Sequence, residues 1–202
     1  MRSRARPTGK YPSWKTGRMM QWESPNELNA FRLLDCIPEV TTFGEQPCEI
    51  VYLDENGEEA SHFPDIEVRV SGCRELWEVK TESDAVRDPI STRTELLTRE
   101  LPAHGFIYRI VTAEYLRRQP RLKSMCKLLD FGRRQVTEVE REYIRRKIVN
   151  RLVLVWRDAC SGQYGPYGRE ILCRLVLEGC LKIDVESSID AGTPFIPIPG
   201  RM

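Results

Sequence analysis

The chain has 202 residues, 41% of them hydrophobic and 30% charged, and a formal net charge of +1 at pH 7. This composition is ordinary for a globular protein, and the length suffices for one sizeable core with a small accessory domain. No run of about eighteen apolar residues occurs, so we expect no membrane span. The basic N-terminus lacks the apolar stretch of a secretory signal, so we expect a cytoplasmic protein.

Seven cysteines are spread widely along the chain. No Cys-x-x-Cys pair and no Cys/His cluster occurs, so the sequence does not favour a zinc site. We expect reduced, mostly buried thiols. The seven are Cys36, Cys48, Cys73, Cys126, Cys160, Cys173 and Cys180.

Charge is distributed unevenly. Residues 1–22 carry six Lys or Arg and no acid, and residues 117–151 carry twelve against four acids. The intervening residues 23–100 carry nineteen acids against seven Lys or Arg. An acidic segment between two basic ones suits a protein that binds metal ions through the acidic segment and DNA phosphates through the two basic segments. Solvated helix faces would give the same pattern.

The first half of the chain predicts an α/β order. Four Pro or Gly residues interrupt residues 1–22, for which we expect an irregular basic arm. A capping box of Ser24 and Glu27 then predicts a helix that Pro38 ends. Strand patterns follow at residues 49–53, 61–70 and 75–80, joined by Asn56-Gly57 and Ser71-Gly72 turns, which predict a three-stranded meander. A helix over 84–99 and a buried strand over 106–111 complete this part, before Thr112 caps a short helix.

The pattern after Pro120 changes to helices with scattered arginines. A second capping box, Thr137 with Glu140, predicts a helix, and a further amphipathic helix is expected over 169–178 with Gly179 just past its end. A short strand is expected over 181–185. We therefore divide the chain into an arm (1–22), a core (23–118) and a small helical, winged-helix-like module (119–202).

The chemically informative feature is Pro64-Asp65, followed thirteen residues after the aspartate by Glu78-Val79-Lys80. The predicted hairpin places Asp65 and Glu78 on adjacent strands. Phosphodiester hydrolysis uses a hard divalent ion, which carboxylate oxygens hold. Lys80 shares a strand face with Glu78 and would reach the same cavity, where it would orient water and offset developing charge. A plain surface pair on an alternating strand is the alternative, because such spacings are common by chance.

Two other acids precede these strands. Glu27 would complete the acidic pocket if its helix packs on the meander, or it would only close the capping box. Glu23 is its rival and could equally be a solvated charge. His62 could contact DNA or a ligand, although a structural hydrogen bond is the simpler interpretation. No nucleophile elbow and no Walker-type glycine loop appears in the sequence.

Taken in order, these motifs resemble the TnsA family, the endonuclease subunit of heteromeric transposases. The resemblance covers residues 20–120, about half of the chain, and rests on Glu23-Ser24-Pro25-Asn26-Glu27, Leu33-Leu34-Asp35, Glu45-Gln46-Pro47, His62-Phe63-Pro64-Asp65 and Trp77-Glu78-Val79-Lys80. It implies a restriction-endonuclease-like core, a central mixed sheet flanked by helices. Some family members have Gln where Glu78 stands, so the acid is compatible with the family.

The resemblance also implies a role and a site. Glu27, Asp65 and Glu78, with the Val79 backbone carbonyl, would bind Mg²⁺, for which Mn²⁺ would substitute, and Lys80 would serve the nucleophile. In a bacterial cell the chain would cut the 5′ ends of a transposon, on the non-transferred strands of double-stranded DNA. Its partners would be a DDE recombinase of the TnsB type and an AAA+ ATPase of the TnsC type.

Two basic groups are candidates for gripping DNA phosphates, with solvated helix surface as the alternative: Arg117, Arg118, Arg121 and Lys123, and then Arg145, Arg146 and Lys147. Two other functions stay open. A nuclease of the same core could work alone in restriction, defence or repair. A non-catalytic adaptor could link DNA to an AAA+ regulator, although an adaptor has no need of the carboxylate–lysine set.

Overall fold

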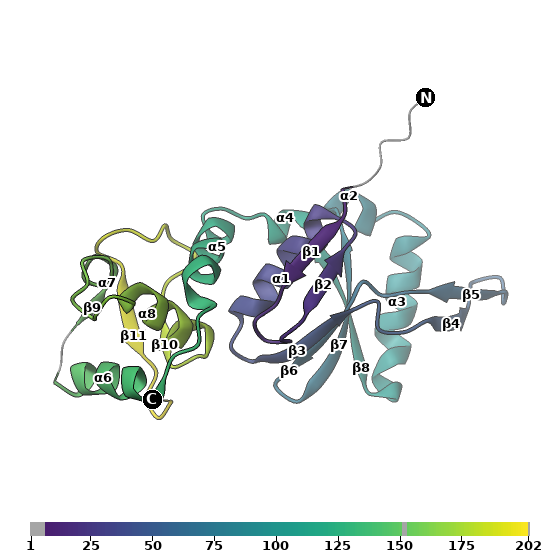
Figure 1. Ribbon diagram of the computed structural model, residues 1–202. Coiled ribbons are helices and arrows are strands. Elements are labelled where there is room, and N and C mark those ends of the chain that lie inside the picture. Colours follow the sequence, from purple (N-terminus) through teal and green to yellow (C-terminus); the bar gives the residue numbers. More distant parts are fainter. Residues whose placement is uncertain (1–6, 151–152, 202) are drawn as a thin grey trace. The chain divides into compact units, whose positions relative to one another are not determined.

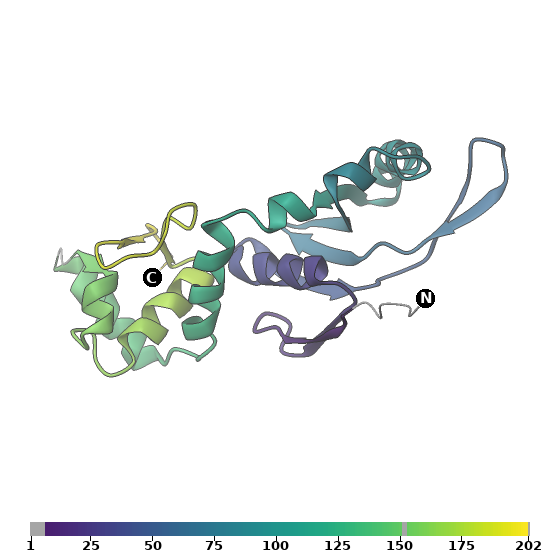
Figure 2. The same ribbon diagram turned by 90° about the horizontal axis from the view of Figure 1, so that it is seen from above.

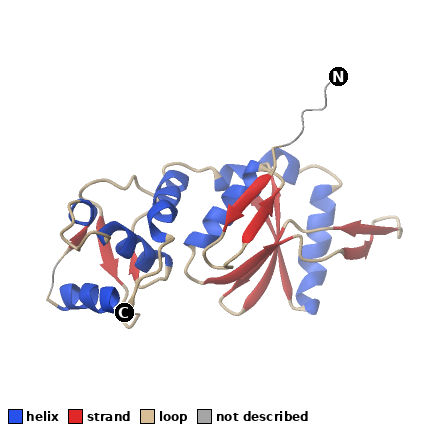
Figure 3. Cartoon of the chain, viewed as in Figure 1, coloured by secondary structure: helices blue, strands red, loops and turns tan. Residues whose placement is uncertain are grey.

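The computed structural model describes residues 7–150 and 153–201, shown in Figures 1 and 3. These residues divide into two compact units. Unit 1 comprises residues 1–34 and 39–117, and unit 2 comprises residues 35–38 and 118–202. Within the described ranges, no helix is both long and apolar enough to cross a membrane.

Unit 1 is a mixed α/β structure. Its helices, including the short 3₁₀ turn η1, and its strands are, in chain order, β1 (Gly9–Pro12), β2 (Met19–Trp22), α1 (Pro25–Cys36, whose last two residues belong to unit 2), β3 (Val40–Glu45), β4 (Ile50–Leu53), β5 (Glu59–His62), β6 (Ile66–Val70), β7 (Cys73–Lys80), α2 (Glu82–Ala85), α3 (Ile90–Glu100), η1 (Leu101–His104), β8 (Phe106–Thr112) and α4 (Ala113–Leu116).

The central sheet has four strands in the order β3-β6-β7-β8. The first three strands are antiparallel to their neighbours, and β8 runs parallel to β7, so the sheet is mixed. Strands β6 and β7 are joined by a two-residue turn in which Ser71 and Gly72 both have positive φ, 50° and 83°. Such a turn matches the twist of the flanking strands. The expected mixed sheet with flanking helices is confirmed.

Helices cover both faces of this sheet (Figure 2). On one face Phe31 of α1 packs against Phe43 of β3, with ring centroids 5.8 Å apart. On the other face Leu76 and Tyr108 form a buried cluster with Leu97 of α3. Full burial of such side chains contributes roughly 1.5–3 kcal/mol each. These two cores fix α1 and α3 against the strands that carry the candidate site.

The predicted meander is wrong in one respect. The return strand expected over 61–70 is two strands, because Phe63, Pro64 and Asp65 interrupt it. Its first part, β5, pairs only with β4 in a separate two-stranded sheet, and its second part, β6, joins the central sheet. Proline lacks the N–H that a strand ladder needs, which explains the break.

Two further expectations differ from the structure. The described part of the predicted arm contains an antiparallel hairpin, β1 with β2, in which Tyr11 and Met20 are buried. The helix expected over 84–99 is split into α2 and α3 around Pro89. The capping box of Thr137 and Glu140 is as predicted. At α1, Ser24 Oγ accepts from Glu27 N at 3.2 Å as predicted, but the Glu27 carboxylate accepts from the Glu23 amide.

Unit 2 is built from helices and a small sheet. Its elements are α5 (Arg121–Gly132), α6 (Glu138–Val149), β9 (Leu154–Val155), α7 (Trp156–Cys160), α8 (Gly168–Leu177), β10 (Leu181–Lys182) and β11 (Pro194–Pro197). The three strands form an antiparallel sheet in the order β10-β11-β9.

Helices α5 and α8 pack closely in unit 2. A Cβ atom at Gly132 would lie 2.6 Å from Leu177 Cδ1 and 3.1 Å from the backbone carbonyl carbon of Cys173, so a larger residue would force α5 or α8 to shift. Gly179 follows α8 with φ 74°, as predicted for a residue just past a helix end. All seven cysteines are free as expected, but only Cys173 and Cys180 are buried, so most thiols are more exposed than predicted.

Candidate functional site

Strand register brings Asp65 and Glu78 together. Ile66 of β6 pairs with Trp77 of β7, so one step further Asp65 stands opposite Glu78. The Asp65 carboxylate is also held directly: the Val79 amide donates to Asp65 Oδ2 at 2.6 Å. The Asp65 carbonyl accepts from the Gln46 amide at 3.0 Å. Backbone hydrogen bonds therefore fix this aspartate at the start of β6.

Lys80 points into the same place. It lies two residues beyond Glu78 on β7, so both side chains leave the same face of the strand. The Lys80 ammonium contacts Glu78 Oε1 and lies 4.0 Å from Asp65 Oδ2. The three residues singled out by spacing in the sequence therefore form one cluster.

Two further side chains contact Glu78, whose side chain is only 3% exposed, and a third contacts one of these two. Arg93 of α3 places Nη2 3.4 Å from Glu78 Oε1. His62 Nε2, at the end of β5, lies 3.0 Å from Glu78 Oε2 and 3.0 Å from the Tyr108 hydroxyl on β8. Glu78 is thus a buried carboxylate next to two permanent cations and an imidazole.

The two carboxylates have opposite pKa shifts. Burial raises the pKa of Glu78, but the contacts with His62 and Lys80 outweigh it, so the net pKa is lowered and Glu78 stays ionised. Burial, helped by the negative charge of Glu78, raises the pKa of Asp65 from 3.8 to about 6. Paired carboxylates with diverging pKa values are typical of functional sites.

Glu27 is placed differently from the other two acids. Its Oε1 accepts from the Ser24 hydroxyl and its Oε2 from the Glu23 amide, both at 2.8 Å. Its charge contributes to the raised pKa of Asp65, so it lies near the cluster. Its carboxylate nevertheless serves the helix cap, the simpler of the two predicted roles. Among residues 7–150 and 153–201, no group of three or more His, Cys, Asp or Glu is gathered to hold a metal ion.

A divalent cation held by two carboxylates still fits the cluster. Glu78 Oε2 is buried and makes no aligned hydrogen bond. The N–H and C=O of one strand residue point the same way, so the Val79 carbonyl faces the side on which Asp65 accepts its amide. Mg²⁺ is usually held by one or two carboxylates and completes its shell with water and phosphate oxygens. Asp65, Glu78 and the Val79 carbonyl match that donor set.

Glu23, the rival of Glu27, has a structural contact. Its Oε1 accepts from the Gln46 side-chain amide at 3.1 Å. Gln46 has a positive φ of 43°, and its own amide donates to the Asp65 carbonyl. Gln46 therefore links Glu23, just before α1, to Asp65, just before β6.

The first basic group is divided between the units. Arg117 belongs to unit 1 and is 55% exposed, with its Nε donating to the Ala113 carbonyl at 3.2 Å. Arg118 and Lys123 are exposed on unit 2. Arg121 is only 4% exposed and lies 3.7 Å from Glu186. Arg121 is therefore withdrawn as a candidate for gripping phosphate.

The second basic group lies on α6. Arg145 and Arg146 both pair with Glu142, at 2.6 and 2.8 Å, and remain exposed. The Lys147 ammonium lies 5.1 Å from the centre of the Tyr143 ring. Exposed ion pairs of this kind contribute at most about 1 kcal/mol, so phosphate could displace them at little cost.

The residues missed from the sequence are Arg93 and Tyr108, and His62 was left open. Arg93 and His62 reach Glu78 from α3 and β5, and Tyr108 reaches His62 from β8, so no local pattern marks them. The only signal was the position of His62 three residues before Asp65. Compared with models of protein families the chain matches none, and compared with curated proteins it matches none either.

Proposed function

We propose that the chain is a metal-dependent DNA endonuclease with a restriction-endonuclease-like core in unit 1. The observation that carries this proposal is the cluster that Asp65, immediately before β6, forms with Glu78 and Lys80 of β7. The carboxylates are partly or fully buried, and the lysine is placed between them. A structural ion pair would need one acid, whereas this cluster buries two acids whose mutual repulsion is costly.

Each of these residues would have its own role in phosphodiester hydrolysis. Asp65 and Glu78, with the Val79 carbonyl, would hold a divalent cation, Mg²⁺ or Mn²⁺. When bound, such an ion polarises the phosphate and lowers the pKa of its water. Lys80 positions the attacking water and offsets negative charge that develops on the phosphate. Arg93 and His62 hold Glu78 in place, and the contacts with His62 and Lys80 keep it ionised.

Lys80 has to exchange partners for this role. Its ammonium contacts Glu78 Oε1 and lies 4.0 Å from Asp65 Oδ2. Lys80 would have to leave Glu78 Oε1 for its ammonium to reach the attacking water or the phosphate. The side chain is 27% exposed, so this movement does not require the core to open.

The biological setting that we propose is transposition. Its support is the TnsA-like order of motifs in residues 20–120, of which Asp65, Glu78 and Lys80 lie in one cluster. The chain would cleave the 5′ ends of a transposon as one subunit, beside a TnsB-like DDE recombinase and a TnsC-like AAA+ ATPase. Unit 2, with three main helices and a three-stranded antiparallel sheet, would be a winged-helix-like module that binds DNA or a partner.

The test is strand-specific cleavage of labelled DNA that carries the ends of the element in which the gene lies. Wild type and Asp65→Ala are compared in Mg²⁺, each with and without the recombinase encoded beside it. Nicking at the 5′ ends that needs both Asp65 and the recombinase supports the subunit role. Asp65-dependent cleavage by the chain alone supports a free-standing nuclease instead, and no cleavage in any mixture supports the adaptor.

A further inference from the structure

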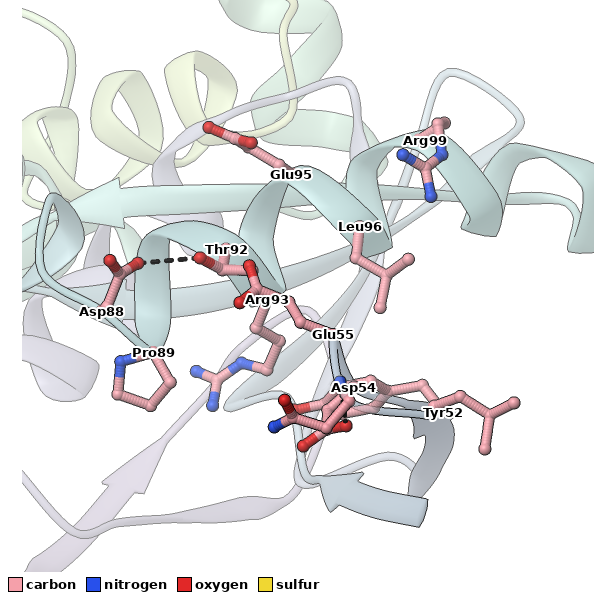
Figure 4. Close-up of a pocket in the computed structure, with 12 residues that line it drawn as sticks. Tyr52, Asp54, Glu55, Asp88, Pro89, Thr92, Arg93, Glu95, Leu96 and Arg99 are labelled. Atoms are coloured by element: carbon pink, nitrogen blue, oxygen red, sulfur yellow. Dashed lines mark hydrogen bonds between the residues drawn. The ribbon is translucent and has the colours of Figure 1, made fainter. Parts of the chain in front are cut away.

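A groove runs between the β4–β5 hairpin and helix α3 in unit 1. It consists of two adjoining hollows of about 650 and 570 Å³, which share the lining residues Tyr52, Leu53 and Leu96. Figure 4 shows Leu96 pointing from α3 toward the hairpin that carries Asp54 and Glu55. Volumes of this size are typical of binding clefts.

The floor of the groove is apolar. Tyr52 packs on the buried cluster of Leu76, Leu97 and Tyr108. Leu96, which directly precedes Leu97 on α3, also lines the groove. Leu53 is 63% exposed at the hairpin end. Aliphatic surface left open beside a formed core is typical of an interaction site.

The rim of the groove is acidic. Six carboxylates line the two hollows: Glu49, Asp54, Glu55, Asp88, Glu95 and Glu100. The lining arginines are already engaged, Arg93 with Glu78 and Arg99 with Glu100 at 2.7 Å. The hairpin segment 49–62 has five acids and neither Lys nor Arg. The rim therefore presents uncompensated negative charge.

Hydrogen bonds favour the ionised form of two acids of the rim, Asp54 and Asp88. Backbone hydrogen bonds from Glu58 and Asn56 lower the pKa of Asp54. Hydrogen bonds from the Ser91 and Thr92 hydroxyls lower the pKa of Asp88. Negative charge repels DNA phosphates, and a second copy of the chain would bring the same acidic hairpin.

We propose that this groove docks a basic amphipathic helix of a partner protein, with aliphatic side chains on the floor and Lys or Arg against the rim. The mode is that of a helix laid in a hydrophobic groove, with charge complementarity selecting the partner. This site adjoins the carboxylate–lysine cluster through Arg93, which lines the groove and contacts Glu78, but helix docking does not depend on cleavage. It gives unit 1 a protein-binding face in addition to its candidate active site.

The test uses the full chain and a short fluorescein-labelled amphipathic helix of leucine and lysine, with fluorescence anisotropy as the readout. Two further probes are a scrambled peptide of the same composition and a leucine–glutamate peptide. We expect the amphipathic basic peptide alone to bind. The groove variant Leu53→Lys with Glu55→Lys should weaken that binding about tenfold or more.

The matched control variant is Glu138→Lys with Val139→Lys on α6. It makes the same change of charge and of apolar surface at positions that are 92% and 80% exposed. Binding in this control should stay at the wild-type level. The proposal is overturned if the basic peptide does not bind, if the scrambled peptide binds equally well, or if both variants weaken binding alike. It is also overturned if sedimentation velocity shows that the groove mediates self-association which the groove variant abolishes.

Discussion

Replacement of Asp65 by Asn should stabilise the folded protein. A carboxyl whose pKa rises from 3.8 to about 6 costs the folded state about 3 kcal/mol when it is ionised. Asn keeps an oxygen to accept the Val79 amide and removes the repulsion from Glu78. The Asp65 side chain is 25% exposed, so we expect a gain of about 1–2 kcal/mol.

The gain should depend on pH in a defined direction. The folded state raises this pKa, so protonated Asp65 is favoured in the fold below about pH 4, and that advantage is lost as pH rises through about 6. The difference between Asp65→Asn and wild type should therefore be largest near pH 8 and vanish near pH 4.

Urea unfolding followed by tryptophan fluorescence measures this difference. A Trp156→Phe background leaves only the tryptophans of unit 1, so the signal reports the unit that contains Asp65. Glu49→Gln, at an exposed position of the same unit, is the carboxylate-to-amide control and should change little. If Asp65→Asn is no more stable than wild type at pH 8, Asp65 does not share a buried site with Glu78.

Three other changes test the surroundings of the site and of unit 2. Glu27→Gln should keep the α1 cap and change the free energy of unfolding by less than about 1 kcal/mol. A large loss of Mn²⁺ affinity in this variant, measured by calorimetry, would show that Glu27 belongs to the metal site. Arg93→Met should destabilise unit 1 by about 1–3 kcal/mol in urea, because Glu78 loses a cation in a buried setting; unchanged stability would mean that Lys80 alone satisfies Glu78. Thr137→Ala should cost about 1 kcal/mol in the unfolding of unit 2, followed by Trp156 fluorescence, and no loss would contradict the capping geometry of α6.

The candidate site was predictable where it depends on neighbours in the chain. Asp65 and Glu78 meet because a two-residue turn joins β6 to β7, and Ser71-Gly72 is a strong turn signal. Lys80 follows from the alternation of side chains along a strand. The capping boxes at Ser24 and Thr137 were equally visible, because their contacts lie three residues apart.

What the sequence did not reveal depends on contacts between distant segments. Arg93 reaches Glu78 only because α3 packs over the sheet. Arg121 is buried beside Glu186. The helical pattern of the sequence does not indicate this burial, so the sequence suggested an exposed cation. The hairpin β1–β2 was hidden by a turn-rich composition that also describes irregular arms.

The strand break at Pro64 was also not predicted from the sequence. Its place beside Asp65 was read as part of one continuous strand, although proline interrupts strand ladders. The break separates β5 from β6 and so creates the hairpin that borders the acidic groove. A local rule was available here, and it was outweighed by the strong hairpin signal at Asn56-Gly57.

The central claim is that Asp65 and Glu78 form a metal-dependent nuclease site, and the most direct test is the metal dependence of DNA cleavage. Wild type, Asp65→Ala and the control Asp130→Ala, at an exposed position on α5, are incubated with the labelled end DNA and the recombinase in Mg²⁺, Mn²⁺ or EDTA. The account predicts cleavage by wild type and by Asp130→Ala with either cation, and none by Asp65→Ala or in EDTA. Cleavage by Asp65→Ala at the wild-type rate would contradict it.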